Sequence, residues 1–278
     1  MAEELNLREI QLGAYEVLKK IHQICIEQHL TYFLIYGTLI GAIRNKGIIP
    51  WDDDIDIMMP RPDYEKLKKY FISNEEILKP YKFFDKSTVP DYPHMIARIS
   101  DMRYCVTFNN EKNYGIGLFV DIYPLDGVGT DETRAIRLLH KTKKIASLCF
   151  LTSRRSFGVD NTDSKLKMII KCPAYIWAKF RGNTHYIKIL TRFSNMFRYE
   201  DSEYVACLVW PAGKKYGRER DVFKKNIFDT IDYPFEDGIF KIPAGYDEFL
   251  SVTYGDYMTP PEEKGKKTHH TYSVRKVL

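Results

Sequence analysis

The chain has no hydrophobic run long enough to cross a lipid bilayer as a helix. Its longest apolar runs are about a dozen residues or fewer, whereas a spanning helix needs roughly 20. The first residues, MAEELNLREIQL, are acidic and amphipathic, and they lack the basic and apolar regions of a secretory signal peptide. We therefore expect a cytoplasmic protein.

Cysteine is scarce and scattered. The five positions, none of them at CxxC spacing, are Cys25, Cys105, Cys149, Cys172 and Cys207. An odd number of isolated cysteines argues against a disulfide framework and against a cysteine-based zinc site. A reducing compartment fits this usage.

The composition is that of a folded chain with a large core. Hydrophobic residues make up 44% and charged residues 28% of the 278 positions, which excludes intrinsic disorder. The aromatic share of 14%, with 20 Tyr and 16 Phe, favours strands and stacking surfaces over a simple helical bundle. The length allows one large domain or two ordinary ones.

The net charge of +5 hides a strongly basic middle segment. Residues 134–192 contain 14 Lys and Arg and two acids, a net +12, while the rest of the chain sums to −7. Apolar residues of this segment, such as Leu139, Leu148, Ile176 and Phe180, recur at helical spacing. Basic amphipathic helices bind anionic surfaces such as phospholipid or a polyanionic polymer. The alternative is a pair of surface helices whose apolar faces belong to the core.

Hydrophobic periodicity predicts an α/β (α+β) protein. Residues 5–29 carry apolar side chains at three- and four-residue steps, which is typical of an amphipathic helix, and shorter helices are expected over 39–46 and 63–72. Strands are predicted at 31–36, 54–59, 95–99, 103–108 and 117–124.

Four segments are expected to be irregular. Residues 80–94 are polar and contain prolines, and residues 125–127 should turn the chain. The stretch 230–261 is rich in Pro, Gly, Tyr and Asp, so we expect a looped cap there. The polar residues from Glu262 onward are predicted to form a mobile tail.

A glycine-threonine pair follows the first predicted strand. Gly37 allows a phosphate to approach the backbone, and the N–H groups of the next helix together with the Thr38 hydroxyl can hold its oxygens. Most strand-to-helix junctions of this kind are ordinary turns, so the pair alone does not define a site.

Two carboxylates alternate with apolar residues after Trp51. On a strand, Asp54 and Asp56 project to the same side, about 7 Å apart, and they repel unless a cation lies between them. Mg²⁺ is the usual cation beside a nucleotide phosphate. A solvated acidic loop or a structural Ca²⁺ loop is the alternative, although EF-hand spacing is absent. Asp52 and Asp53 precede the strand and are expected to shape the loop.

A third acid, Asp121, lies inside the apolar run FVDIY. A buried carboxylate is costly unless it binds a metal, pairs with an arginine or changes its pKa. The alternative is an aspartate at a strand end that makes a structural hydrogen bond.

Together these motifs resemble the nucleotidyltransferase superfamily and, more narrowly, the LicD family of phosphotransferases. The matching blocks are GTLIGAIRNKGIIPWDDDIDIMM, FVDIYPLDGV and FEDGIFKIPAGYDEFLSVTYGDYMTPPEEK. The resemblance runs from about Leu7 to about His270 and is weakest in the basic segment. It implies a nucleotidyltransferase-like mixed sheet core with flanking helices.

The resemblance also implies an activity. Members move a phospho-alcohol from a CDP-activated donor to a glycan hydroxyl, and bacterial members often move phosphocholine from CDP-choline to teichoic acid or lipopolysaccharide. By position, Asp54, Asp56 and Asp121 match the catalytic, metal-binding carboxylates, with Mg²⁺ (or Mn²⁺) as the cofactor and Asp121 as a candidate base. Gly37 and Thr38 match the turn that grips the donor phosphate.

Further candidates follow from position. Arg44 could reach a donor phosphate as a fixed cation, or it could be a surface charge. The candidates for holding a choline head by cation–π contacts are Trp210, Tyr216, Tyr254 and Tyr257. Residues that could meet an anionic acceptor or a phosphate are Lys214, Lys215, Arg218, Arg220, His269 and His270.

The chain divides into three predicted parts: a nucleotidyltransferase-like catalytic core over 1–130, a basic helical segment on the acceptor or membrane side over 131–205, and a C-terminal cap over 206–278 that completes the active site. The expected function is metal-dependent transfer of phosphocholine from CDP-choline to teichoic acid or another cell-surface glycan precursor, lipid-linked precursors included, with release of CMP. Peripheral contact with an anionic membrane is expected, and no nucleic acid partner.

Two alternatives remain open at this point. One keeps the mechanism and changes the donor to CDP-ribitol or CDP-glycerol. The other, of a different class, is a non-catalytic basic protein that docks on membrane or nucleic acid.

Overall fold

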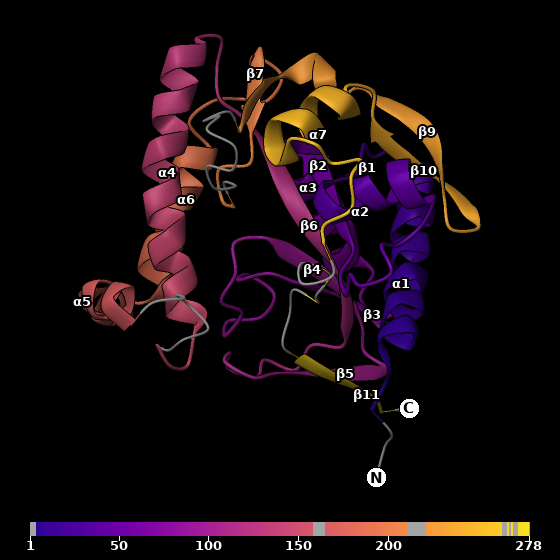
Figure 1. Ribbon diagram of the computed structural model, residues 1–278, viewed down its shortest axis with the longest axis horizontal. Helices are drawn as coiled ribbons and strands as arrows, with labels where there is room; N and C mark the ends of the chain where they lie inside the picture. Colours follow the sequence, from indigo (N-terminus) through magenta and orange to yellow (C-terminus); the bar gives the residue numbers. More distant parts are fainter. Residues whose placement is uncertain are drawn as a thin grey trace.

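The computed structural model describes residues 4–157, 165–210, 221–262, 266, 268 and 272–277. In these ranges the chain forms a mixed sheet with helices packed against it, so the predicted α/β (α+β) class is confirmed (Figure 1). The helices are α1 (Leu7–Glu27), α2 (Tyr36–Ile40), α3 (Arg61–Ser73), α4 (Glu132–Ser153), α5 (Lys165–Arg181), α6 (Asn183–Ser194) and α7 (Tyr246–Tyr254), with a π-helical turn η1 (Gly41–Asn45) and a 3-10 turn η3 (Lys225–Phe228). The strands are β1 (Phe33–Leu34), β2 (Asp56–Pro60), β3 (Tyr81–Phe84), β4 (Ala97–Asp101), β5 (Tyr104–Phe108), β6 (Leu118–Gly127), β7 (Tyr204–Ala206), β8 (Val222–Lys224), β9 (Thr230–Phe235), β10 (Gly238–Pro243) and β11 (Tyr272–Lys276).

The central sheet is built around β6. Its strands follow the order β1-β2-β6-β4-β3, β7 pairs with the far end of β6, and β8 pairs with β7. The β2–β6 pair is parallel and the other pairs are antiparallel. In the parallel register Asp56 lies beside Asp121, so two predicted site residues become neighbours.

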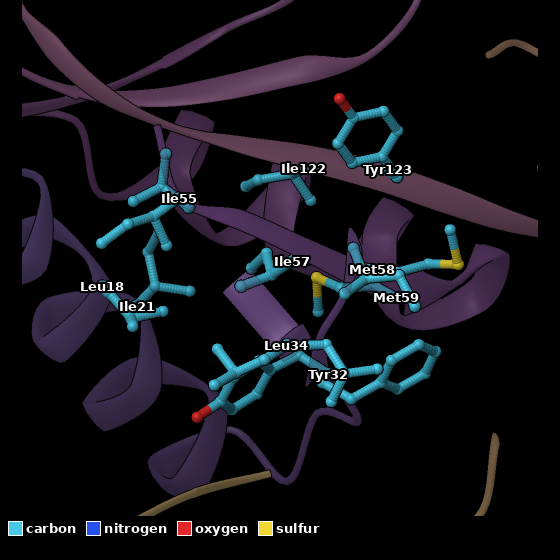
Figure 2. Close-up of a cluster of buried hydrophobic side chains, with 14 of the residues drawn as sticks. Leu18, Ile21, Tyr32, Leu34, Ile55, Ile57, Met58, Met59, Ile122 and Tyr123 are labelled. Carbon is cyan, nitrogen blue, oxygen red and sulfur yellow. The ribbon is translucent and has the colours of Figure 1, made fainter. Parts of the chain in front are cut away.

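The main core lies between α1 and the sheet. The first helix begins with a capping box, in which the Asn6 side chain accepts from the Glu9 backbone N–H and the Glu9 carboxylate accepts from the Asn6 N–H. Its apolar face then turns to the sheet, as the periodicity predicts. Figure 2 shows Leu18 and Ile21 of this helix packed with Leu34 and Ile57 of the strands.

Two of the expected irregular segments are partly regular. Within 80–94, residues 81–84 form β3, because Phe83 and Phe84 are buried and pair with β4. Residues 125–127 do not turn the chain. They continue β6, since β7 pairs with Asp126 and Gly127 and extends the ladder.

The looped cap and the mobile tail are also more ordered than expected. Residues 230–243 form the β9–β10 hairpin, and α7 follows it. Pro234, which has no backbone N–H, is compatible with this because both strands of a two-stranded sheet are edges, where a residue need not donate to a neighbouring strand. In the tail, β11 pairs with β5 over all five of its residues.

The basic segment forms α4, α5 and α6, which lie together at one side of the sheet (Figure 1). On α4 the apolar face belongs to the core, with Leu138 and Leu139 buried against β7 and β8 residues. None of the helices in the described ranges is long and apolar enough to span a membrane. The three-part division of the chain stays a prediction.

Candidate active site

Three carboxylates converge at the start of the parallel strand pair. One oxygen from each of Asp54, Asp56 and Asp121 lies within 4.8 Å of the others. The strand begins at Asp56, so Asp54 lies in the loop before β2 and not on the strand as expected. Oxygens that bind one Mg²⁺ lie about 3–4 Å apart, because each metal–oxygen bond is about 2.1 Å long. Small side-chain movements therefore suffice for this triple to hold a divalent cation.

Asp56 shows why a cation fits this triple. Its side chain is buried, and its Oδ1 atom makes no hydrogen bond within the described part of the chain. Burial, reinforced by the charges of Asp54 and Asp121, holds the pKa of Asp56 well above its usual range. A bound cation would satisfy the oxygen and offset the repulsion between the carboxylates.

Asp121 is held by an arginine that the sequence analysis did not name. Arg98, on the neighbouring strand β4, donates from Nε to Asp121 Oδ1 at 2.6 Å. Both side chains are almost fully buried, and Arg98 also donates to the Tyr114 hydroxyl at 2.7 Å and lies 4.0 Å from the centre of the Phe119 ring. Burial lowers the pKa of Arg98, but the neighbouring Asp121 carboxylate more than compensates, so its pKa is raised. The ion pair fixes the Asp121 carboxylate in place.

Two distant parts of the chain hold the loop that carries Asp52, Asp53 and Asp54 in place by hydrogen bonds. The buried Gln11 amide of α1 donates to the carbonyls of Ile49 and Asp52, at 3.2 and 2.8 Å. From β11, the Tyr272 hydroxyl donates to the Asp53 carbonyl at 2.6 Å. Asp52, Asp53 and Asp54 also form a second close group of carboxylates. The loop backbone is thus held in place, while the loop-shaping role of Asp52 and Asp53 stays a prediction.

The Gly37–Thr38 pair lies in the first turn of α2, next to the carboxylates. The Thr38 hydroxyl accepts a hydrogen bond of 2.8 Å from the Asp56 backbone N–H, so it positions the start of β2. A side-chain carbon added to Gly37 would lie 2.7 Å from Asp52 Oδ2. Any larger residue at this position would have to displace the Asp52 carboxylate. Contact of either residue with a donor phosphate stays a prediction.

Substituting this glycine should damage the site and spare the fold. In Gly37→Ala the new methyl group must push the Asp52 carboxylate aside, and the loop cannot follow freely because Gln11 holds its backbone. We expect turnover to fall about tenfold or more, since displacements near 1 Å in an active site are costly. Steady-state kinetics beside circular dichroism would measure this, and a variant with wild-type turnover would show that the close approach is unimportant.

The carboxylates open into a cavity of about 660 Å³ with aromatic walls. Asp54 and Asp56 line it, whereas the almost fully buried Asp121 does not. The aromatic residues that line it are Tyr36, Trp51, Tyr123, Trp210, Tyr254 and Tyr257. Three of the four aromatic residues named from the sequence are therefore in the cavity, and the fourth, Tyr216, lies outside the described residues.

Tyr36 is placed in the cavity by an unusual backbone. Its φ of 51° is in the left-handed region, which few residues other than glycine adopt. Its ring packs edge-on against Tyr123, with 5.0 Å between the ring centres. Burial raises the pKa of Tyr36, Tyr123 and Tyr254 well above the usual value, and the nearby Asp56 adds to this, so all three rings stay neutral beside the acids.

Arg44 lies on the cavity wall, in η1. Its guanidinium donates to the Tyr257 carbonyl and to the Asn45 side chain, both at 3.0 Å, and lies 5.8 Å from the centre of the Trp51 ring. Burial lowers its pKa somewhat. Arg44 thus lines the cavity that holds the carboxylates, and phosphate binding by Arg44 stays a prediction.

The remaining candidates are not near the carboxylates or cannot be placed. Arg154 of the basic segment pairs with the buried Glu111 at 3.4 Å, so it has a structural role. The residues of the cap and tail that lie outside the described ranges are Lys214, Lys215, Arg218, Arg220, His269 and His270.

Comparison with known proteins shows the family to which the chain belongs. Residues 29–162, which include all three carboxylates, match the family model described as LicD/FKTN/FKRP, nucleotidyltransferase domain. A lipopolysaccharide cholinephosphotransferase, LicD, of Haemophilus influenzae is 30% identical over 274 residues, and the match covers 96% of this chain and 97% of the relative. The chain belongs to the LicD family and is a transferase, so the non-catalytic alternative is set aside.

Two shorter matches are to uncharacterized rickettsial proteins. The Rickettsia typhi protein is 30% identical over 117 residues, covering 41% of this chain and 35% of the relative. The Rickettsia prowazekii protein is 35% identical over 66 residues, covering 24% and 25%.

Proposed function

We propose that the protein transfers phosphocholine from CDP-choline to a hydroxyl of a cell-surface glycan precursor, such as a lipopolysaccharide or teichoic acid unit, and releases CMP. The observation that carries this proposal is a cavity in which clustered carboxylates and aromatic walls lie together. Carboxylates suit a metal-bound diphosphate, and aromatic faces suit a quaternary ammonium group. The full-length relative named as a cholinephosphotransferase supports the same reading. Action in the cytoplasm is part of the proposal.

The proposed cofactor is Mg²⁺ (or Mn²⁺), held by Asp54, Asp56 and Asp121. When bound, the cation neutralises charge on the donor diphosphate and on the departing CMP. The acceptor oxygen would form a bond to the choline-side phosphorus. The bond between that phosphorus and the bridging oxygen would break, so that the bridging oxygen leaves with CMP. The proton of the acceptor hydroxyl would pass to a carboxylate. Because Asp121 is paired with Arg98 and is almost fully buried, we assign it to the metal rather than to the proton.

The other side chains of the cavity bind and orient the donor. The aromatic walls would hold the trimethylammonium group by cation–π contacts and exclude water from it. Arg44 would approach a donor phosphate from the side of Trp51. CDP-ribitol or CDP-glycerol remains the alternative donor, and the aromatic lining favours choline because polyols need polar partners.

The donor assignment is tested by CMP release from CDP-choline, CDP-ribitol and CDP-glycerol, with and without Mg²⁺ and a glycan acceptor. We expect the choline donor to be preferred and Trp210→Leu to raise its KM about tenfold, since a desolvated cation–π contact contributes about 2 kcal/mol. Trp177→Leu is the matched control, because Trp177 is on α5 and does not line the cavity. Equal use of all three donors, or an unchanged KM in Trp210→Leu, would contradict the choline assignment.

The basic segment should serve the anionic acceptor more than the donor. Lys141, Lys144 and Arg155 are exposed, and replacing all three with Gln should raise the apparent acceptor constant severalfold while the donor constant stays nearly unchanged. High salt should raise the wild-type acceptor constant too, because exposed charges are screened within about 10 Å at 0.1 M salt. Arg154 is left intact because of its bond to Glu111.

The control for this triple variant removes three positive charges outside the basic segment. Lys66, Lys79 and Lys112 are exposed and lie outside the segment, so their replacement by Gln should leave both constants unchanged. Equal effects of the two triple variants would mean that net charge alone matters.

A further inference from the structure

Helix α5 presents an apolar stripe to solvent, whereas the apolar face of α4 is buried. Ile176, Trp177 and Phe180 are 62%, 56% and 80% exposed, and the exposed Pro173 precedes them by one turn. These four residues, at i, i+3, i+4 and i+7, lie on one side of the helix and are called the α5 stripe. The rings of Trp177 and Phe180 are neighbours, with 6.2 Å between their centres.

The opposite side of α5 is fixed to the protein. Ala178 is fully buried in a cluster with Cys149 of α4 and with Tyr186 and Leu190 of α6. Lys179 donates to the Thr152 carbonyl at 2.9 Å, and the Tyr175 hydroxyl donates to the Arg155 carbonyl at 3.1 Å. These contacts hold the α5 stripe facing outward, and Figure 1 shows α5 at the edge of the molecule, away from the sheet.

The part of the chain that carries the α5 stripe is basic. Residues 165–199 contain eight Lys and Arg and no acid. Lys171 and Arg181 are exposed on α5 itself, and the Arg181 guanidinium lies 5.8 Å from the centre of the Trp177 ring. Tryptophan beside basic residues is typical of the boundary between lipid headgroups and acyl chains. A second copy of the chain would bring the same positive charges together, which disfavours self-association through this face.

We propose that the α5 stripe is a docking edge for an anionic lipid membrane. Trp177 and Phe180 would enter the boundary between headgroups and acyl chains, while the basic residues would contact lipid phosphates. The helix would lie along the surface, since it is not apolar enough to cross the bilayer. This deepens the proposed function by placing the enzyme where a lipid-linked acceptor would be, and its test does not depend on turnover.

The test is cosedimentation with vesicles. Wild-type protein should bind vesicles containing 30% phosphatidylglycerol, roughly tenfold more than vesicles of pure phosphatidylcholine, and 0.5 M NaCl should weaken this binding, as expected where exposed charges contribute. Trp177→Ser with Phe180→Ser should lower the affinity for anionic vesicles about tenfold or more, because two large apolar side chains no longer insert. Ile77→Ser with Ile239→Ser is the matched control, since both isoleucines are exposed and lie outside α5.

Each outcome decides the proposal. Equal binding by the stripe variant and the control, or wild-type protein that ignores anionic vesicles, would overturn it. A wild-type dimer in sedimentation that the stripe variant loses would show that a second copy covers the α5 stripe instead. CMP release with a water-soluble acceptor should be unchanged in the stripe variant, so that failure of docking and failure of the proposed transfer are distinguishable.

Discussion

Asp54→Ala and Asp56→Ala should each reduce transfer at least about 1,000-fold in saturating Mg²⁺. Each removes one proposed metal ligand from the group of carboxylates that lie within 4.8 Å of one another, and the donor diphosphate would then lose the cation that offsets its charge. The fold should survive, because removing a buried like charge relieves repulsion. Melting temperatures equal to or above the wild-type value are therefore expected in metal-free buffer.

The measurement combines turnover with calorimetric titration of Mg²⁺. Wild-type protein should lose activity in EDTA and regain it with Mg²⁺ or Mn²⁺, whereas the two variants should show neither binding nor rescue. Asp256→Asn is a matched control, because Asp256 lines the same cavity outside the carboxylate group. Near-normal turnover by either alanine variant would remove these residues from the metal site.

Arg98→Met should destabilise the protein more than any other single substitution considered for the site. It leaves the Asp121 carboxylate buried without its partner, and breaking a buried ion pair typically costs 3–5 kcal/mol. For a chain of this size, that corresponds to a drop in Tm of about 10 °C. Adding Asp121→Asn should restore much of the loss, because the buried charge is then absent, while transfer stays abolished.

Thermal denaturation of the two single variants and the double variant gives the coupling between these residues directly. Arg198→Met serves as control, since Arg198 is 76% exposed, its acidic partners are also exposed, and such pairs contribute little. Additive effects of the two site substitutions would mean that Arg98 does not stabilise Asp121. If the Asp121 carboxylate is a metal ligand, the single variant Asp121→Asn should bind CDP-choline and Mg²⁺ less tightly than the wild-type protein does.

The carboxylates of the candidate site could be recognised in the sequence because they occur where polar residues are unusual. Asp56 and Asp121 stand in otherwise apolar strands, and the cost of burying a charge without a partner points to a function. Arg98 gives the same signal inside MIARI, yet pairing it with Asp121 requires the register of β4 on β6. Gln11 is a comparable case, a polar residue on the buried face of an amphipathic helix.

Other features depend on contacts that local patterns do not contain. The apolar residues of α4 and α5 recur with the same helical period, but Leu138 and Leu139 of α4 are buried whereas Trp177 and Phe180 of α5 are exposed, so the two helices could not be distinguished beforehand. The strand near the C-terminus also depends on a distant contact. The sequence of β11 is polar, and it becomes a strand only by pairing with β5.

The hydrogen bond from Tyr272 to the Asp53 carbonyl has a consequence for biosynthesis. The two residues are 219 positions apart, so at a synthesis rate of about 5–20 residues per second the acidic loop leaves the ribosome roughly 10 to 45 s before its last support exists. During that interval Gln11 can already hold the other end of the loop. A nascent or prematurely terminated chain would thus carry an acidic loop that lacks one of its supports, and the metal affinity that we propose for the aspartates would be complete only when the polypeptide is nearly finished.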